Sequence, residues 1–101
     1  MPAYVIVDVT TYNREEMEEY RRQTPATISA FDGKFIVRGG QTTILEGEWN
    51  PERIVVLEFP TADKAREWWN SDLYANPKLL RQGAGITKMI LVEGVKESVK
   101  V

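Results

Sequence analysis

Three predicted β-strands in this chain carry apolar side chains on both faces, and this feature limits the possible folds more than any other. Residues 3–9 alternate as a strand does, with valines on one face and with Tyr4 and Ile6 on the other. Residues 54–59 and 87–93 have the same two-sided pattern. An antiparallel sheet with one face in water alternates apolar and polar side chains. Both faces of this sheet are therefore expected to be covered.

Two segments between the strands have the periodicity of helices. Asn13 is a good N-cap for the first, with Glu16 three residues later as a capping box needs. Apolar side chains then recur at steps of three and four over residues 17–31, across Pro25. This predicts one helix kinked at the proline or two short collinear helices. Thr61 caps the second helix, whose core face is expected to hold Ala62, Ala65, Trp68 and Trp69.

The connecting segments are less regular. The pair Asp32-Gly33 is expected to end the first helix, because glycine suits a left-handed C-terminal cap. A strand over residues 34–38 is interrupted by Gly39-Gly40, and residues 42–49 are expected to resume the extended conformation. Residues 73–82 contain an Asn-Pro pair and are expected to form a short helical or looped excursion.

The order strand, helix, strand, strand, helix, strand predicts one α+β domain over residues 1–95, followed by a polar tail over residues 96–101. With right-handed crossovers this is a ferredoxin-like βαββαβ fold, a four-stranded antiparallel sheet with two helices on one face. Two helices cover only that face, and the other would expose more apolar area than a monomer tolerates. A homodimer through the sheet faces is the favoured remedy. The alternative is that Trp49, residues 73–82 and the tail fold over this face.

Composition excludes several kinds of site. The 101 residues include no Cys and no His, which removes disulfides, thiolate nucleophiles, the usual zinc ligands and the commonest general base near neutral pH. No metal or cofactor is expected. The formal net charge is −2 without a basic block, so nucleic-acid binding is not expected. The longest apolar run, residues 3–7, is far shorter than the ~20 residues of a membrane-spanning helix, and the cytoplasm is the expected location.

Short motifs spread along the chain together resemble a known family. They are Arg38-Gly39-Gly40, Glu46-Gly47, Pro51, Arg53, Glu58-Phe59, Ala65, Trp68, Ser71, Tyr74, Arg81 and Glu93-Gly94. Over residues 3–94 the sequence resembles the domain of unknown function 1330 family of small bacterial proteins, in the dimeric α+β barrel superfamily. The resemblance implies the fold and the dimer but no activity. The superfamily includes cofactor-independent monooxygenases, isomerases, haem enzymes and ligand-sensing domains, and a histidine-ligated haem does not fit a chain without His.

Five residues are candidates for binding a ligand: Arg38, Glu46, Trp69, Tyr74 and Arg81. Arginines near strand ends, Arg53 among them, could hold a carboxylate through paired hydrogen bonds. The Trp and Tyr side chains could wall a pocket for a flat or apolar molecule. The alternatives are structural. Arg38 would then pair with Glu46 or Glu58, Arg53 would pair with Glu48 across the hairpin, and at least one of the neighbouring tryptophans would belong to the core.

These observations favour one function and leave others open. The favoured prediction is a small dimeric protein that binds a small organic acid or aromatic metabolite between the sheet and the helices. It would act as a cofactor-independent enzyme of monooxygenase or isomerase type, with arginine stabilising an enolate or a carboxylate. The alternatives are a non-catalytic binding or sensing module and a purely structural dimer. Without His, proton transfer near neutral pH would need a perturbed carboxylate or tyrosine, and no catalytic residue is assigned.

Overall fold

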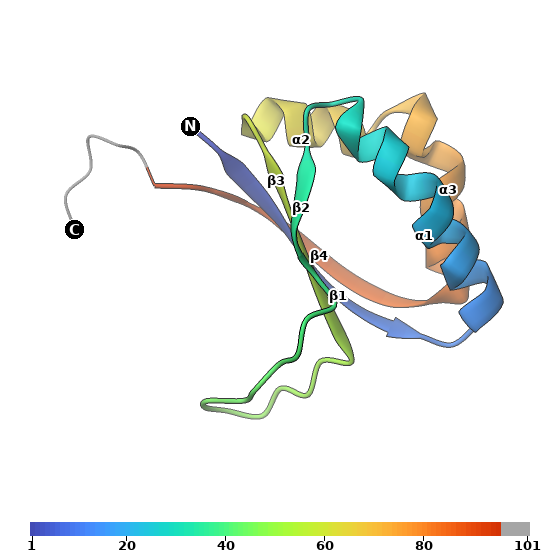
Figure 1. Ribbon diagram of the computed structural model, residues 1–101, viewed down its shortest axis with the longest axis vertical. Coiled ribbons are helices and arrows are strands. Elements are labelled where there is room, and N and C mark those ends of the chain that lie inside the picture. The colour runs from blue at the N-terminus through green and yellow to red at the C-terminus, as the bar shows by residue number, and fades with distance from the viewer. Residues whose placement is uncertain (96–101) are drawn as a thin grey trace.

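The computed structural model describes residues 1–95, which form a four-stranded antiparallel sheet with three helices on one side of it (Figure 1). The strand order is β2-β3-β1-β4, so the first strand of the chain lies inside the sheet and pairs with β3 and β4. In chain order the elements are β1 (Ala3–Thr11), α1 (Arg14–Ser29), β2 (Lys34–Arg38), β3 (Arg53–Phe59), α2 (Ala62–Trp69), α3 (Asp72–Ala84) and β4 (Gly85–Glu93). The predicted α+β, ferredoxin-like class is confirmed.

The pairing register places one apolar row of each long strand toward the helices. Val5 of β1 lies opposite Leu57 of β3 and Leu91 of β4. Alternate residues of β1 are buried from Ala3 to Val9, as expected for side chains that face the core. The largest of the fully buried side chains come from the helices and the end of β3: Met17, Ile28, Phe59, Trp68 and Tyr74.

The helix starts predicted from the sequence are confirmed. The Oδ1 of Asn13 accepts a hydrogen bond of 3.1 Å from the N–H of Glu16, and the Oγ1 of Thr61 accepts one of 3.1 Å from the N–H of Lys64. Each cap satisfies one of the free N–H groups at a helix start. The first helix, α1, continues through Pro25 as one element.

Two segments differ from the expectation. Residues 42–49 are not a strand, because they lie within an exposed loop between β2 and β3 that projects from the sheet (Figure 1). Residues 73–82 belong to the regular helix α3, which packs against α1. Within residues 1–95 the helices therefore number three rather than two, in the order βαββααβ.

The end of α1 also differs in detail. Asp32, not Gly33, takes the left-handed conformation, with a φ of 62°. Gly33 is needed for space instead: a β-carbon there would lie 2.6 Å from the ring of Phe59 and 2.8 Å from Ile28. The glycine lets the turn after α1 approach the core closely.

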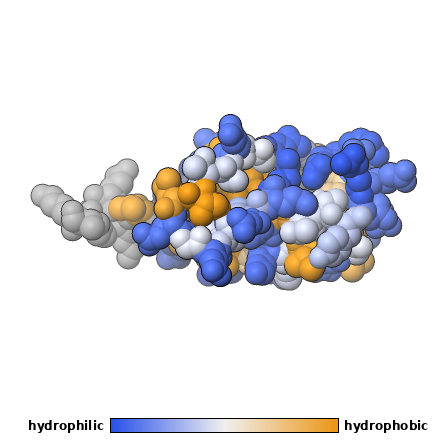
Figure 2. All heavy atoms as spheres, turned by 90° about the horizontal axis from the view of Figure 1, so that it is seen from below, coloured by the Kyte–Doolittle hydropathy of each residue, from blue (hydrophilic) through white to orange (hydrophobic). Residues whose placement is uncertain are grey.

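The face of the sheet opposite the helices carries exposed apolar side chains. On β4 these are Ile86, Ile90 and Val92, and Ile90 is 60% exposed. Trp49 of the β2–β3 loop reaches this face, where its indole N–H donates a hydrogen bond of 2.8 Å to Asp8 Oδ2. The single indole ring of Trp49 does not cover the exposed apolar side chains of β4. Figure 2, a view from below, shows apolar patches among the charged side chains of the surface.

Of the three segments that could have covered this face, Trp49 does so in part. Residues 73–82 lie in α3 on the other side of the sheet, and residues 96–101 lie outside the described part of the chain. Among the helices of residues 1–95, none has the length and hydrophobicity needed to cross a bilayer.

Candidate functional site

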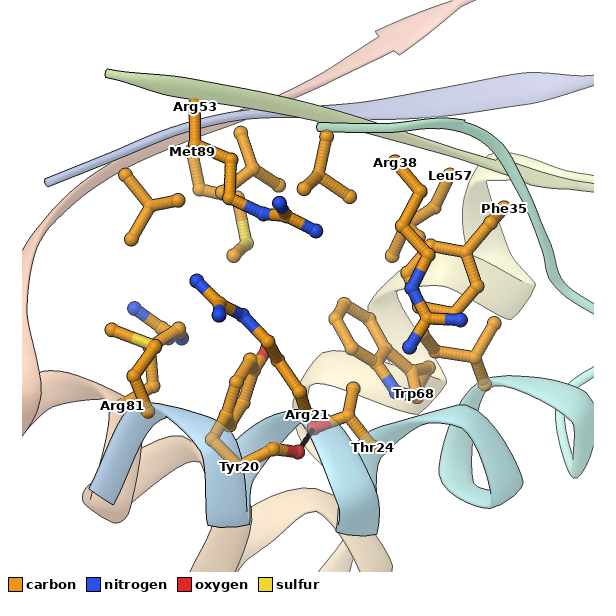
Figure 3. Close-up of a pocket in the computed structure, with 15 residues that line it drawn as sticks. Tyr20, Arg21, Thr24, Phe35, Arg38, Arg53, Leu57, Trp68, Arg81 and Met89 are labelled. Carbon is orange, nitrogen blue, oxygen red and sulfur yellow. Dashed lines mark hydrogen bonds between the residues drawn. The ribbon is translucent and has the colours of Figure 1, made fainter. Parts of the chain in front are cut away.

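A cavity of about 50 Å³ lies between α1 and the helix-facing side of the sheet (Figure 3). Its polar lining consists of four arginines with Tyr20 and Thr24. The remaining lining is apolar and comes from all four strands, α1 and α2: Val7, Val9, Met17, Ile28, Phe35, Val55, Leu57, Trp68 and Met89. No acidic side chain lines the cavity. An apolar hollow with a few convergent polar groups is the usual form of a small-molecule site.

The fold brings the four arginines together from four elements. Arg53 begins β3 opposite Val9, and Arg38 ends β2 opposite Val55, so both side chains lie on the helix-facing side of the sheet. Arg21 comes from α1, and Arg81 comes from α3. Figure 3 shows their guanidinium groups around the space between α1 and the strands.

The positive charge of these arginines is not neutralised within the described chain. Among residues 1–95, none of the four forms an ion pair. The ion pairs considered for Arg38 and Arg53 are absent there, and Glu58 instead pairs with Lys34 at 3.3 Å. Burial lowers the pKa of Arg53, and repulsion from the charges of Arg21 and Arg38 lowers it further. An anion would relieve this repulsion.

Arg38 is positioned by an aromatic ring. Its guanidinium carbon lies 4.3 Å from the centroid of the Phe35 ring, also on β2. A β-bulge between Phe35 and Val37 changes the register of β2 against β3. The bulge places Phe35 opposite Leu57 and Arg38 opposite Val55, which puts both on the helix-facing side. A cation above a ring face is held by the quadrupole of the ring.

Arg81 forms a buried wall of the cavity with two tyrosines. It is only 5% exposed, and its Nε–H donates a hydrogen bond of 3.2 Å to Tyr74 Oη. The hydroxyl groups of Tyr74 and Tyr20 lie 2.7 Å apart and share a hydrogen bond. Burial, with the neighbouring Tyr74 hydroxyl, raises the pKa of Tyr20 well above the usual tyrosine range. Tyr20 therefore keeps its proton at neutral pH.

The two neighbouring tryptophans have different roles. Trp68 is 1% exposed, stacks at 4.1 Å on Tyr74, and donates its indole N–H to Thr27 Oγ1 at 3.0 Å. Trp68 therefore belongs to the core, as predicted for at least one of the two, whereas the prediction that Trp69 shares the core face of α2 is wrong. Trp69 is 40% exposed, and the ammonium of Lys78 lies 3.6 Å from its ring centroid. Trp69 lines a second, open hollow of about 400 Å³ beside α2, α3 and β4, which shares Trp68, Arg81 and Met89 with the cavity.

The structure places the five predicted site residues in different environments. Arg38 and Arg81 line the cavity, and Tyr74 lies behind Arg81. Trp69 lines the other hollow, and Glu46 lies in the exposed loop, so neither belongs to the cavity. Whether any of these residues binds a ligand remains a prediction.

In residues 1–95, no group of three or more acidic side chains could hold a metal ion.

The cavity includes one arginine that sequence reasoning missed. Arg21 was not among the candidates, because it lies in a charged stretch of α1. The available signal was its position four residues after Met17 and three before Thr24, both of which face the core. This spacing puts Arg21 on the edge of the buried stripe rather than on the back of the helix.

Comparisons with known proteins find the same fold. A family model described as "Domain of unknown function (DUF1330)" matches residues 2–95. The structure of RPA0582, a protein of unknown function from Rhodopseudomonas palustris, matches with a TM-score of 0.75 and 17% identity, over 94% of this chain and 83% of that chain. The solution structure of the hypothetical Arabidopsis thaliana protein At3g17210 matches with a TM-score of 0.68 and 12% identity, over 97% and 92%.

A third structure belongs to a protein with a stated activity. SnoaB, a cofactor-independent oxygenase from Streptomyces nogalater, matches with a TM-score of 0.57 and 13% identity, over 98% of this chain and 96% of that chain. At identities this low, the likeness shows a shared fold, that of the dimeric α+β barrel proteins. No protein with a curated description matches the chain.

Proposed function

This chain belongs to the DUF1330 family, and we propose that it binds a small organic acid, as its anion, in the cavity between α1 and the sheet. One observation carries the proposal: four arginines line an apolar cavity that has no acidic side chain in its wall. Uncompensated buried charge is costly, and arginine matches the geometry of a carboxylate through two parallel hydrogen bonds. The apolar lining suits the hydrocarbon part of the same ligand.

The size and the exposure of the cavity limit the ligand. Its volume of about 50 Å³ suits a short molecule. Arg38 is exposed, and Arg21 and Arg53 are partly exposed, so a ligand would enter on their side. Arg81 and Trp68, which also line the cavity, are buried. A carboxylate would therefore meet the partly exposed arginines, while its apolar part would contact the valine and methionine side chains of the wall.

The protein is further proposed to act as a homodimer through the sheet face that carries no helix. The supporting observation is the row of exposed apolar side chains on that face, Ile86, Ile90 and Val92 of β4. Burying this row against a second copy would remove apolar surface from water, at about 25 cal/mol for each Å². The cavity lies on the opposite side of the sheet, so each protomer would keep its own.

Calorimetric titration and thermal-shift measurements with a panel of small organic acids test the binding proposal. The wild-type protein is expected to bind at least one acid, whereas Arg38→Ala and Arg81→Ala are each expected to lose about tenfold or more in affinity. Arg14→Ala is the matched control, because Arg14 is exposed at the start of α1 and does not line the cavity. Unchanged affinity in both cavity variants would show that the site is wrong.

Turnover of the bound acid without a cofactor is the second candidate function. The observation that favours it is the chain of hydrogen bonds from Arg81 through Tyr74 to Tyr20, which holds a phenolic proton beside the cavity. SnoaB shows that this fold can carry cofactor-independent oxygenation, which supports the idea by analogy only. Native mass spectrometry of the protein incubated with the acid separates the two functions. An unchanged ligand indicates binding alone, and a new product indicates an enzyme.

A further inference from the structure

The four arginines of the cavity differ in their exposure to solvent. Arg21, Arg38 and Arg53, here called the outer arginines, are at least partly exposed, and they lie close enough together for two of them to affect the ionisation of the third. Arg81 is 5% exposed and is held on the buried wall by its hydrogen bond to Tyr74. A ligand whose single carboxylate binds the exposed outer arginines would bring no second anionic group to the buried Arg81.

The donors of Arg81 are only partly used by the protein. A guanidinium group carries five N–H donors. Within residues 1–95, the recorded hydrogen bond of Arg81 is the one from Nε to Tyr74 Oη, and no carboxylate pairs with it. Arg81 lines this cavity and also the hollow beside α2, α3 and β4, and a ligand in the cavity would lie against its side chain. A buried cation without a counter-charge is costly, so an anionic group of the ligand would be strongly favoured there.

The remainder of the lining does not compete for such a group. The side chains of Val7, Met17 and Met89 offer no donors, and Tyr20 and Thr24 already have partners. The ligand that matches this arrangement has an anionic group at each end and a short apolar middle.

We propose that the ligand is a short dicarboxylic acid, with one carboxylate on the outer arginines and the other on Arg81. This inference rests on the proposed function, since it names the class of anion that the same cavity would select. It goes further because it assigns to Arg81 a role in ligand specificity that the outer arginines do not share. The outer arginines would bind any carboxylate, whereas Arg81 would distinguish diacids from monoacids.

Calorimetric titration of the full-length protein with matched pairs of acids tests this assignment. Succinate, glutarate and adipate are each compared with the monocarboxylate of equal chain length, and inorganic phosphate serves as a compact anion. We expect one diacid to bind about tenfold or more tightly than its matched monoacid, because each charge-assisted hydrogen bond adds about a factor of ten. The preference should pass through a maximum with chain length, since the two arginine positions are fixed.

Variants then locate the second carboxylate. Arg81→Met preserves the bulk of the side chain and should reduce the diacid preference to less than about threefold, because it should lower the affinity for the diacid more than the affinity for the matched monoacid. Arg81→Lys keeps the positive charge, and it replaces Arg81→Met in the measurement if the methionine variant does not fold. Arg38→Gln should weaken diacids and monoacids alike, and the exposed Arg14→Ala should change neither.

The outcomes separate this inference from the proposed function. Equal affinity for diacids and monoacids would overturn the diacid assignment and leave the proposed binding function in place. The diacid assignment would also be overturned if phosphate bound as tightly as the best diacid. One compact anion would then bind the arginines as well as two linked carboxylates do. If no acid binds, both proposals are wrong.

Discussion

The guanidinium group of Arg53 occupies the space where a β-carbon on Gly39 would lie. Gly39 follows β2 with a φ of 71°, a left-handed conformation that glycine adopts without strain. Its N–H donates a hydrogen bond of 2.9 Å to the carbonyl of Ile54, next to Arg53 in β3. The glycine therefore both ends the pairing of the two strands and leaves room for the arginine to turn toward the cavity.

Gly39→Ala should displace Arg53 and weaken acid binding. The new methyl group collides with the guanidinium, and the positive φ adds about 1–2 kcal/mol of strain. Titration calorimetry should show affinity about tenfold lower than wild type. Gly40→Ala is the control, because no atom lies within 4 Å of a β-carbon there and its φ is not positive. Equal losses of acid affinity in the two variants would show that the affinity depends on the backbone of the loop and not on the position of Arg53.

The site was predictable from the sequence only in part. Arg38 and Arg81 were identified because arginines near the ends of elements often bind ligands, and both line the cavity. Glu46 and Trp69 are also candidates from the sequence, but Glu46 lies in the exposed β2–β3 loop and Trp69 lies on the outer face of α2. Periodicity gives the face of a helix but not the packing between helices. It therefore could not show that α3 turns Arg81 toward a cavity formed by α1.

Replacing the two neighbouring tryptophans should have unequal effects on stability. Trp68→Leu removes a buried ring and leaves Thr27 without its indole donor, and should lower the free energy of unfolding by about 3 kcal/mol or more. Trp69→Leu mainly removes the contact with Lys78, which is worth about 1 kcal/mol at most. Urea denaturation followed by circular dichroism measures both. Similar losses would contradict the assignment of Trp68 alone to the core.

The stability of the protein should fall at alkaline pH because of Tyr20. Its pKa is raised in the folded state by burial, whereas in the unfolded chain it loses its proton above about pH 10. The folded state therefore binds more protons in this range, and the free energy of unfolding decreases as pH rises. Tyr20→Phe should flatten this dependence between about pH 9 and pH 11.

Denaturation at a series of pH values checks this expectation. Tyr12→Phe is the control, because that side chain is 72% exposed in the folded protein. A slope that is as steep in Tyr20→Phe as in wild type would show that another group causes the alkaline loss.

The fold was predictable to a greater extent than the site. The strands with apolar side chains on both faces predict the sheet correctly. The capping residues Asn13 and Thr61 predict where the first two helices begin. The segment 42–49 was wrongly assigned, because its Thr, Ile and Leu side chains suit a strand, but the sheet offers it no partner. For the segment 73–82, Pro77 makes the sequence pattern compatible with either a short helix or a loop. This proline is buried within α3, which begins at the Ser71 cap and packs along α1.

Ile90→Lys should separate the proposed dimer. Ile90 is 60% exposed on the helix-free face of β4, an edge strand of the sheet, and a lysine there would bring an unpaired charge into the proposed interface. Light scattering should report twice the 11.6 kDa chain mass for wild type and a single chain for the variant at micromolar concentration. Leu79→Lys on the outside of α3 is the control and should stay dimeric. A wild-type protein of 11.6 kDa would contradict the dimer.

The anion-binding cavity is tested most directly by a crystal structure of the protein soaked in the small organic acid that binds best in solution. We predict density for a carboxylate within hydrogen-bonding distance, about 3 Å, of guanidinium nitrogens from the outer arginines. The hydrocarbon part should lie between α1 and the sheet. Solvent alone in the cavity, with the acid bound elsewhere on the surface, would contradict the proposed function.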